Sequence, residues 1–591
     1  MGLKPAILTF AASGAATASR IAALTGGTMH ACGPQGEDAK TLLPRLFRDG
    51  TPIVGICAAG ILIRLLALLL ADKYSEPPVI VVSQDGAHVV PLLGGHHGAN
   101  RLAREIAARL GGAAALTTAS DSRFTFGLDE PPEGWVLENP DAAKRAMAAL
   151  LSGASIALEG EAPWLAAAGY PITADGTIKV AASDAIDLIA DLIYRPKALV
   201  AGVGCERGAS PEEVIGLVDA TLANAHLSPL SLAAIATIDI KADERAIHAA
   251  AAHFRVPVRF LTVAELDHER PRLATPSAAV EAEIGTPSVA EAAALKAGRL
   301  IVPKQKSARA TCAIGRAETP IDPQAIGRAR GTLHLVGIGP GDVLSRTASA
   351  TSALEGSSDW VGYGLYLDLI ADLRLEQEEH RFGLGDEEPR VRHALELAAT
   401  GKTVALVCSG DAQIYAMATL VYELLDAAGP RALSDAARRI AIETHPGISA
   451  FQAASAKTGA LIGHDFCCIS LSDLLTPREA ILSRLKAAAE GDFVVALYNP
   501  RSGRRTELLD EAKRIFLGHR PADTPIIIAR DLGRPGEDTH VVTLATFDPE
   551  TVDMLTIVLI GSSTSQAFAR GDGKPVAYTP RGYARKAEAA E

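Results

Sequence analysis

The sequence has few aromatic residues, few cysteines and no excess of positive charge. Phe, Trp and Tyr make up 4% of the 591 residues, and the formal net charge is −12. No basic stripe with interleaved aromatics occurs, so we expect no nucleic-acid partner. The seven cysteines form no C-x-x-C pair, which disfavours a disulfide framework or a zinc site. These absences predict a cytoplasmic protein without a metal centre.

One apolar stretch, residues 53–71, has the length of a membrane span. Arg64 lies near its middle and two glycines occur early in it. A central arginine is costly in lipid, so we interpret the stretch as a buried strand, a turn and an apolar helix. The apolar run at residues 6–10 is soon interrupted, which favours a first strand over a signal peptide. We therefore expect no membrane association.

Apolar runs alternate with helix-like segments along the chain, which predicts an α/β multidomain protein with mostly parallel sheets. A length of 591 residues is enough for three or four domains of about 150 residues each. Composition breaks give these sections: an N-terminal α/β domain (1–128), a central region (129–193), a second α/β domain (194–316), a linker (317–330), a last domain (331–580) and a disordered tail (581–591).

The most informative motif is Ser409-Gly410-Asp411. It follows a β-branched apolar run, 404–408, and precedes Ile-Tyr-Ala-Met-Ala, which is typical of a helix. The turn is therefore expected at the carboxyl end of a strand, where α/β sheets bind small ligands. A glycine there lets a ligand approach the backbone, and the aspartate adds a polar contact.

A second loop, Gly337-Ile-Gly339-Pro340-Gly341-Asp342, invites a dinucleotide interpretation. The G-x-G-x-x-G pattern fails because its sixth position is Asp342. Pro340 also lacks the amide N–H that a phosphate-binding loop would offer. The loop is better explained as the wall of a different ligand site.

Several motifs in this last section together resemble one family. They are Gly362-Tyr363, Ser409-Gly-Asp, Pro446-Gly, His464-Asp-Phe, Ile469-Ser-Leu-Ser-Asp-Leu-Leu-Thr-Pro477 and Tyr498-Asn-Pro. Over residues 334–564 the chain resembles the tetrapyrrole (corrin/porphyrin) methyltransferases, which have a two-lobed α/β fold and use S-adenosylmethionine. The likeness is strongest to members that methylate carbon 17 of precorrin-3B and contract the ring to precorrin-4 in cobalamin biosynthesis.

The resemblance implies roles for individual residues. The residues that it assigns to the methyl donor are Gly410, Asp411, Ile414, Tyr415, Ser449, Ala450, Asn499, Arg530 and Thr556. It places the loop of Gly337, Gly339 and Gly341 on the tetrapyrrole side, together with Tyr363. Asp342, His334, Ser472 and Asp473 are candidates for acid–base chemistry and for contacts with substrate carboxylates. The alternatives are that Ile414 and Tyr415 are helix core, and that His334 is a satisfied core histidine.

The N-terminal half contains Gly94-Gly-His96-His97-Gly-Ala-Asn100 before an amphipathic helix. Adjacent histidines rarely point at one ion, and no third ligand has zinc spacing. We expect His96, His97 and Asn100 to receive a substrate carboxylate at a glycine-rich helix start, with a plain turn as the alternative.

Most of residues 5–315 resembles the cobalt-precorrin-5A hydrolase family, which opens a δ-lactone and expels acetaldehyde. The chain departs from that pattern at Glu76-Pro77 and at Gly94. The leading hypothesis is a bifunctional fusion. Its expected partners are its tetrapyrrole substrate, a second copy of itself in a homodimer and other corrin-pathway enzymes. The alternatives are a methyltransferase fused to a non-catalytic tetrapyrrole holder, the equivalent enzyme of the cobalt-containing pathway (cobalt-factor III methyltransferase), or a regulatory tetrapyrrole-binding module.

Overall fold

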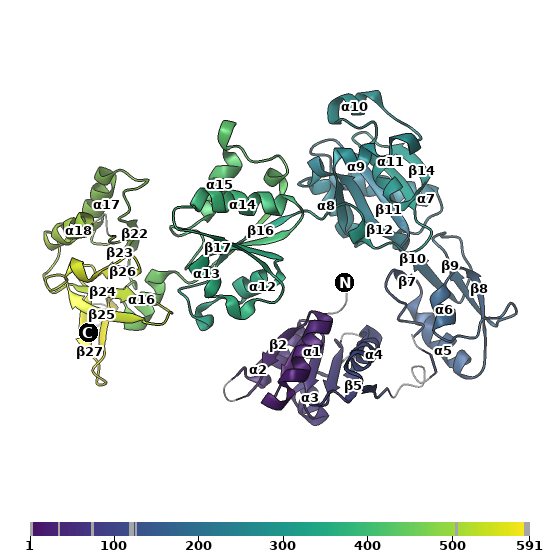
Figure 1. Ribbon diagram of the computed structural model, residues 1–591, viewed down its shortest axis with the longest axis horizontal. Coiled ribbons are helices and arrows are strands. Elements are labelled where there is room, and N and C mark those ends of the chain that lie inside the picture. Colours follow the sequence, from purple (N-terminus) through teal and green to yellow (C-terminus); the bar gives the residue numbers. More distant parts are fainter. Residues whose placement is uncertain are drawn as a thin grey trace. The chain divides into compact units, whose positions relative to one another are not determined.

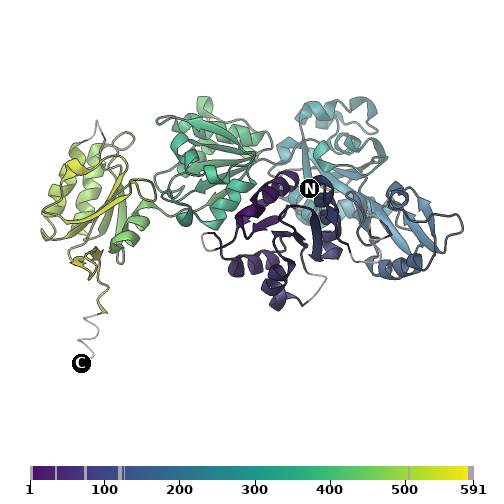
Figure 2. The same ribbon diagram turned by 60° about the horizontal axis from the view of Figure 1, so that its bottom comes forward.

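The computed structural model describes residues 4–33, 36–71, 76–116, 123–124, 127–502 and 506–583. The chain divides into two compact units. Unit 1 comprises Met1–Ile238 and Arg245–Gly327, and unit 2 comprises Asp239–Glu244 and Arg328–Glu591. Unit 1 runs from purple to teal in Figure 1, and unit 2 runs from green to yellow; the same colours follow the chain in the turned view of Figure 2. Within the described residues, no helix has the length and apolar character needed to cross a bilayer.

Unit 1 begins with a six-stranded sheet in the order β2-β1-β3-β4-β5-β6. Its strands are β1 (Ala6–Thr9), β2 (Thr28–Ala31), β3 (Ile53–Ile56), β4 (Val79–Val82), β5 (His88–Leu93) and β6 (Ala113–Ala114). Helices α1 (Ala15–Thr25) and α4 (Ala99–Leu110) cover one face, and α2 (Ala39–Arg48) and α3 (Ala59–Leu66) cover the other. The stretch of membrane length is thus the strand β3 followed by the helix α3, as predicted.

Two further sheets complete unit 1. The first has the order β7-β10-β9-β8, with β7 (Trp135–Leu137), β8 (Ile156–Gly160), β9 (Ile178–Ala182) and β10 (Leu192–Pro196), and carries α5 (Ala143–Leu151) and α6 (Pro163–Ala167). The second has the order β13-β12-β11-β15-β14, with β11 (Leu199–Cys205), β12 (Leu232–Ile238), β13 (Val258–Leu261), β14 (Arg299–Lys306) and β15 (Ala310–Arg316). Its helices are α7 (Pro211–Asn224), α8 (Arg245–Phe254), α9 (Val263–Asp267), α10 (Ala278–Ile284) and α11 (Val289–Ala294).

Unit 2 has two lobes, which confirms the predicted two-lobed α/β fold. The sheet of the first lobe is entirely parallel, in the order β18-β17-β19-β16-β20. Its strands are β16 (Thr332–Gly337), β17 (Asp359–Tyr363), β18 (Glu378–Phe382), β19 (Thr403–Cys408) and β20 (Ala441–His445). Its helices are α12 (Ala348–Gly356), α13 (Gly364–Asp368), α14 (Glu387–Ala399) and α15 (Ala418–Asp426).

The sheet of the second lobe is mixed, in the order β22-β23-β26-β24-β25. Its strands are β22 (Phe466–Ser470), β23 (Val494–Tyr498), β24 (Pro525–Arg530), β25 (Asp538–Thr543) and β26 (Thr556–Ile560). Helices α16 (Ala450–Thr458), α17 (Arg478–Glu490) and α18 (Glu507–Leu517) pack on it, and β21 (Gly459–Ala460), β28 (Pro575–Tyr578) and β27 (Gln566–Ala569) form a small separate sheet. The tail predicted at 581–591 lies outside the described residues from residue 584 onwards.

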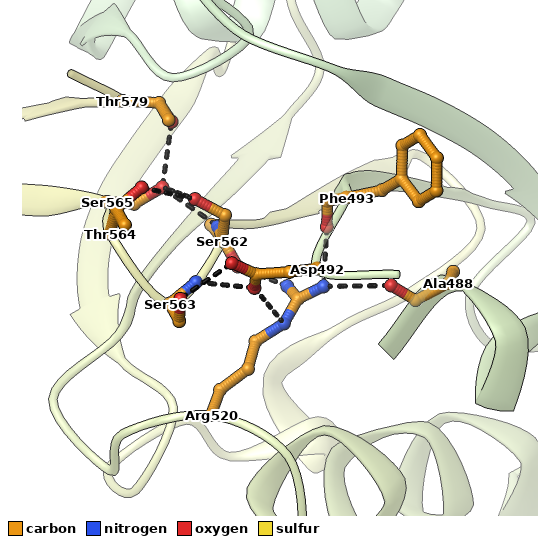
Figure 3. Close-up of polar contacts among 10 residues, drawn as sticks. Ala488, Asp492, Phe493, Arg520, Ser562, Ser563, Thr564, Ser565 and Thr579 are labelled. Atoms are coloured by element: carbon orange, nitrogen blue, oxygen red, sulfur yellow. Dashed lines mark hydrogen bonds and ion pairs between the residues drawn. The ribbon is translucent and has the colours of Figure 1, made fainter. Parts of the chain in front are cut away.

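A buried arginine ties the second lobe together at the amino end of β23. The guanidinium of Arg520 donates to the backbone carbonyls of Ala488, Phe493 and Gly561, and lies 3.6 Å from the carboxylate of Asp492 (Figure 3). Its side chain is fully buried, and burial lowers the pKa of Arg520 to about 10. Such a charge is tolerated inside a protein only because it is hydrogen-bonded and paired. Arg520 therefore has a structural role.

Candidate functional site

Loops from both lobes of unit 2 line one pocket. The first lobe contributes the loops that follow β16 and β19, and the second lobe contributes the start of α16 and the ends of β23, β24 and β26. The residues that line the pocket are Pro340, Tyr366, Ser409, Gly410, Asp411, Ile414, Tyr415, Ser449, Ala450, Tyr498, Asn499, Ala529, Asp531, Leu532, Arg534, Met554, Leu555, Thr556 and Ile557.

Three glycine-containing turns contact one another at the carboxyl ends of β16, β19 and β20. Gly339 and Gly410 exchange backbone hydrogen bonds, with N···O distances of 3.1 and 2.7 Å. A Cβ atom on Gly447 would lie 2.1 Å from the carbonyl oxygen of Gly410, and one on Gly337 would lie 2.6 Å from the same atom. Only glycine permits this approach, and Gly410 also has a left-handed φ of 67°. The turns after β16, β19 and β20 are thereby held against each other.

Asp411 locks this junction. One of its carboxylate oxygens accepts the amide N–H of Gln413 at 2.8 Å, and the other accepts the amide N–H of Gly447 at 3.1 Å. The residue is 9% exposed. The carboxylate therefore fixes the turn after β19 to the turn after β20, and it borders the pocket through the same loop.

The loop after β19 departs from the sequence-based expectation. A helix was expected from Ile414, but α15 begins at Ala418. Tyr415 has a left-handed φ of 51°, and its hydroxyl donates to the carbonyl of Cys468 at 2.9 Å. This tertiary hydrogen bond, together with the Asp411 bond to Gln413, holds the segment in a turn. Tyr415 is half-exposed, so it is not helix core.

Three of the pocket residues have a left-handed backbone. Tyr415, Asn499 and Asp531 have φ values of 51°, 50° and 48°, and all three line the pocket. Side chains other than glycine seldom adopt this region, and strained residues of this kind cluster at functional sites. Asn499 is held by a hydrogen bond from its amide nitrogen to the hydroxyl of Ser470 at 3.1 Å.

Two residues in the pocket wall, Tyr498 and Ser449, have buried hydroxyls that lie next to each other. Burial raises the pKa of Tyr498, whose ring centroid lies 5.0 Å from that of Tyr415. This wall of the pocket thus combines two aromatic rings with two buried hydroxyls.

The opposite wall is built from the loops around β24 and β26. The hydroxyl of Thr556 donates to the carboxylate of Asp553 at 2.7 Å, which also pairs with Arg530 at 2.9 Å. The guanidinium of Arg534 bonds to the hydroxyl of Ser409 at 2.9 Å and to the carbonyl of Pro340 at 3.2 Å. Arg534 thus connects the second lobe to both turns of the first.

The structure brings together the residues assigned to the methyl donor. Gly410, Asp411, Ile414, Tyr415, Ser449, Ala450, Asn499 and Thr556 all line the pocket. Arg530 does not, although its neighbours Ala529 and Asp531 do. Alternation along β24 turns the Arg530 side chain outwards, where it is half-exposed and paired with Asp553.

The acid–base candidates lie beside the pocket and do not line it. Asp342 caps a short 3₁₀ turn, and its carboxylate accepts from the amide and the hydroxyl of Ser345 at 2.9 and 2.7 Å. His334 lies within β16 and contacts His445 of β20. Ser472 and Asp473 follow β22, in a loop whose Leu471 amide bonds to the carbonyl of the pocket residue Tyr498 at 2.9 Å. Their catalytic roles stay predictions.

The substrate-side candidates fall in both units. In unit 2, Gly337, Gly339 and Gly341 form the turn beside Pro340, and the ring of Tyr363 lies 5.2 Å from that of Tyr366, a pocket residue. In unit 1, His97 and Asn100 lie at the short turn that leads into α4. Only the backbone of His96 is described. These three are therefore candidates for a separate site in unit 1.

Sequence reasoning did not assign several pocket residues. Arg534, Asp531, Tyr366, Tyr498 and Met554 line the pocket without having been assigned to it. Tyr498 ends the apolar strand β23 and Asp531 directly follows β24, so the rule that located Ser409-Gly410-Asp411 could have found them. Arg534 has no such signal, because its contact with Pro340 joins residues 194 positions apart.

Comparisons with known proteins agree with this architecture. Residues 332–548 match the family model for tetrapyrrole (corrin/porphyrin) methylases. Residues 41–121 and 199–315 match the models for the cobalamin synthesis G N-terminal region and C-terminus.

Individual relatives match the last section of the chain. A precorrin-3B C(17)-methyltransferase from Sinorhizobium sp is 41% identical over 255 residues, which cover 43% of this chain and 98% of the relative. A cobalt-factor III methyltransferase from Priestia megaterium is 41% identical over 257 residues, 44% of this chain, and this chain spans only 46% of that relative. The crystal structure of the methyltransferase CobJ has 38% identity and a TM-score of 0.39, and covers 42% of this chain and 100% of its own.

Proposed function

The chain belongs to the tetrapyrrole (corrin/porphyrin) methylases, and we propose that unit 2 transfers a methyl group from S-adenosylmethionine to carbon 17 of precorrin-3B, with ring contraction to precorrin-4 in cobalamin biosynthesis. The observation that supports this most strongly is the pocket between the turns after β19, β20 and β23. It gathers the donor residues that the family resemblance assigns, with the exception of Arg530.

The pocket has the chemistry that a methyl donor requires. S-adenosylmethionine carries a cationic sulfonium, an amino acid group and a nucleoside. The π faces of Tyr415 and Tyr498 and the carboxylate of Asp531 suit a cation. The hydroxyls of Tyr498 and Ser449 add polar groups to the same wall, which suits the polar parts of the donor. The glycine turns leave backbone close to any molecule seated there.

Methyl transfer by in-line displacement depends mainly on positioning. Here the turns that hold the donor are fixed to one another by Asp411 and by the Gly339–Gly410 bonds, so little reorganisation is needed on binding. The ring contraction needs a base near a substrate hydroxyl and hydrogen-bond donors for the developing carbonyl. Asp342 and the segment with Ser472 and Asp473 are the proposed acid–base groups, because both adjoin the pocket wall.

The substrate has two candidates, because one relative is named for precorrin-3B and another for the cobalt-containing cobalt-factor III. We propose precorrin-3B, and parallel assays with the two substrates under otherwise equal conditions distinguish them. A faster turnover of cobalt-factor III would reassign the enzyme to the cobalt-containing pathway without affecting the methyl-transfer proposal.

For unit 1 we propose the lactone-opening activity of the cobalt-precorrin-5A hydrolases. The support is the match of residues 41–121 and 199–315 to the cobalamin synthesis G models. Incubation of the full chain with the lactone-bearing corrinoid should release acetaldehyde. A folded protein that binds the corrinoid without releasing acetaldehyde would favour the tetrapyrrole-holding alternative.

We also propose a cytoplasmic homodimer that works alongside other corrin-pathway enzymes. All seven cysteines are free thiols, which suits a reducing compartment. Light scattering of the purified full chain tests the dimer directly, and a monomer mass over the whole concentration range would exclude it.

Donor binding is the most accessible test of the pocket. Titration calorimetry of the full chain with S-adenosylhomocysteine should show one site per chain. The absence of binding heat at several temperatures, confirmed by equilibrium dialysis, would contradict the proposal.

A further inference from the structure

Three potential metal ligands converge on one face of the first lobe, outside the residues that line the pocket. His334 Nδ1 lies 2.9 Å from His445 Nε2. Glu443 Oε2 lies 3.6 Å from His334 Nδ1 and 4.0 Å from His445 Nε2. The three atoms thus form a small triangle, with two imidazole nitrogens and one carboxylate oxygen as its corners.

The parallel pairing of β16 with β20 creates this arrangement. His334 is the direct partner of Glu443, and Val336 is the partner of His445. Because side chains alternate along a strand, residues 443 and 445 point to the same face of the sheet, towards His334. The two histidine side chains are only 13% and 15% exposed, whereas that of Glu443 is 60% exposed. Solvent therefore reaches the triangle from the Glu443 side.

We propose that His334, Glu443 and His445 bind a divalent transition-metal ion of the zinc type. Ligands about 2.0–2.2 Å from a tetrahedral ion lie about 3.3–3.6 Å apart, and the observed separations of 2.9 to 4.0 Å bracket that value. Imidazole and carboxylate donors suit Zn²⁺, and three protein ligands leave a fourth position open to water. The site lies outside the methyl-transfer reaction, which needs no metal.

A neighbouring hydrogen bond prepares His445 for this role. Its Nδ1 atom lies 2.7 Å from the hydroxyl of Ser349, on α12. That oxygen can accept Nδ1–H, which leaves the lone pair on Nε2 free to coordinate. His334 Nδ1 can coordinate in the same way when the proton of its imidazole sits on Nε2.

A second cluster of potential ligands in the same sheet already has a cation beside it. The cluster consists of Asp359, Glu378 and His380, whose ligand atoms all lie within 4.8 Å of one another. The ammonium of Lys402 lies 2.8 Å from Asp359 and 3.7 Å from Glu378. A cation is therefore already present there. In the described part of the chain, Glu443 has ion-pair contacts only with His334 and His445. This second cluster provides a matched control.

The proposed site adjoins the donor pocket through the backbone. His445 ends β20, and two residues later the amide of Gly447 donates to Asp411. An ion held by His334 and His445 would join β20, an edge strand, to β16. It would thereby stabilise the turn on which Asp411 depends.

Zinc binding by the chelator-stripped full chain tests the proposal, independently of any methyl-transfer assay. Equilibrium dialysis against Zn²⁺, with bound metal measured by mass spectrometry, should show one more tightly bound ion per chain in the wild type than in the H334N/H445N variant. At the second cluster, His393 Nε2 lies 3.0 Å from His380 Nδ1, so H380N/H393N removes a comparable histidine pair and should bind as much zinc as the wild type. Equal zinc binding by the folded H334N/H445N variant and the wild type would overturn the proposal.

Two milder variants cover the case in which the double variant does not fold. Glu443→Gln changes an exposed side chain, and Ser349→Ala removes the bond to His445 Nδ1; circular dichroism checks that both are folded. Both should weaken zinc binding, Ser349→Ala by roughly 10- to 100-fold. Co²⁺ added to the stripped wild type should give visible absorption bands that are lost in E443Q. Unchanged zinc affinity and an unchanged Co²⁺ spectrum in E443Q would equally refute the site.

Discussion

Asp411 accepts the amide hydrogen of Gly447 at 3.1 Å, and this bond joins the turns after β19 and β20 beneath the pocket. Its second oxygen is taken by the amide of Gln413. The carboxylate therefore determines the conformation of the two turns, because both of these hydrogen bonds are to backbone amides. Its effect on a bound donor should therefore pass largely through the loops.

Replacing Asp411 with alanine should weaken S-adenosylhomocysteine binding about tenfold or more, since two amides lose their acceptor and an unsatisfied buried amide costs about 1–3 kcal/mol. Asp411→Asn keeps one acceptor oxygen and should fall between the wild type and the alanine variant in calorimetry. Asp435→Ala, at a side chain that is 82% exposed, is the control. Unchanged affinity in D411A would remove Asp411 from the site.

Tyr498→Phe separates a ligand contact from a structural one. Its hydroxyl is buried beside Ser449 and the backbone of Phe451, so removing it should lower the free energy of unfolding by no more than about 1 kcal/mol. Binding of S-adenosylhomocysteine should weaken by about 5- to 10-fold, which corresponds to roughly 1–1.4 kcal/mol. Tyr422→Phe, at an exposed tyrosine, should change neither quantity. A drop in stability with intact binding would show that the hydroxyl serves the fold.

Stability of unit 2 should decrease below neutral pH. Burial is the main cause that lowers the pKa of His334, and the neighbouring His445 lowers it further. Burial likewise lowers the pKa of His393, and His380 adds to that effect. The unfolded chain therefore takes up protons near pH 6.5 before the folded chain does, so stability is complete above that pH and is lost as the pH falls below it. Between about pH 7.5 and 5.5 the melting temperature should fall, and less so in H334N and H393N. An identical fall in both variants would assign the effect to other groups.

Arg520→Met should destabilise the second lobe without altering the pocket. It removes the donors to three backbone carbonyls, and an orphaned buried group costs about 1–3 kcal/mol. For a unit of this size, about 3 kcal/mol lowers the melting temperature by roughly 6–12 °C. Arg431→Met, which breaks a surface ion pair, should have little effect. S-adenosylhomocysteine affinity, measured well below the transition, should be retained in both.

Local sequence patterns predicted the strands and the turn at Ser409-Gly410-Asp411, because apolar alternation and glycine breaks are properties of neighbouring residues. They did not predict the left-handed backbone at Tyr415, which depends on a hydrogen bond to Cys468, 53 positions away. The pairing of His334 with His445 was equally hidden, because it depends on which strands become neighbours in the sheet. The prediction of no metal centre rested on zinc-ligand spacing along the chain, which cannot detect such a pair.

Transfer of an isotopic label tests the central claim most directly. The full chain is incubated with precorrin-3B and S-adenosylmethionine carrying a ¹³C-methyl group, and the product is examined by NMR. We predict one labelled methyl group on carbon 17 of a ring-contracted product, and none when precorrin-3B is omitted. A label on another carbon would contradict the account. The account would also be contradicted if a protein that binds S-adenosylhomocysteine transferred no label to either precorrin-3B or cobalt-factor III.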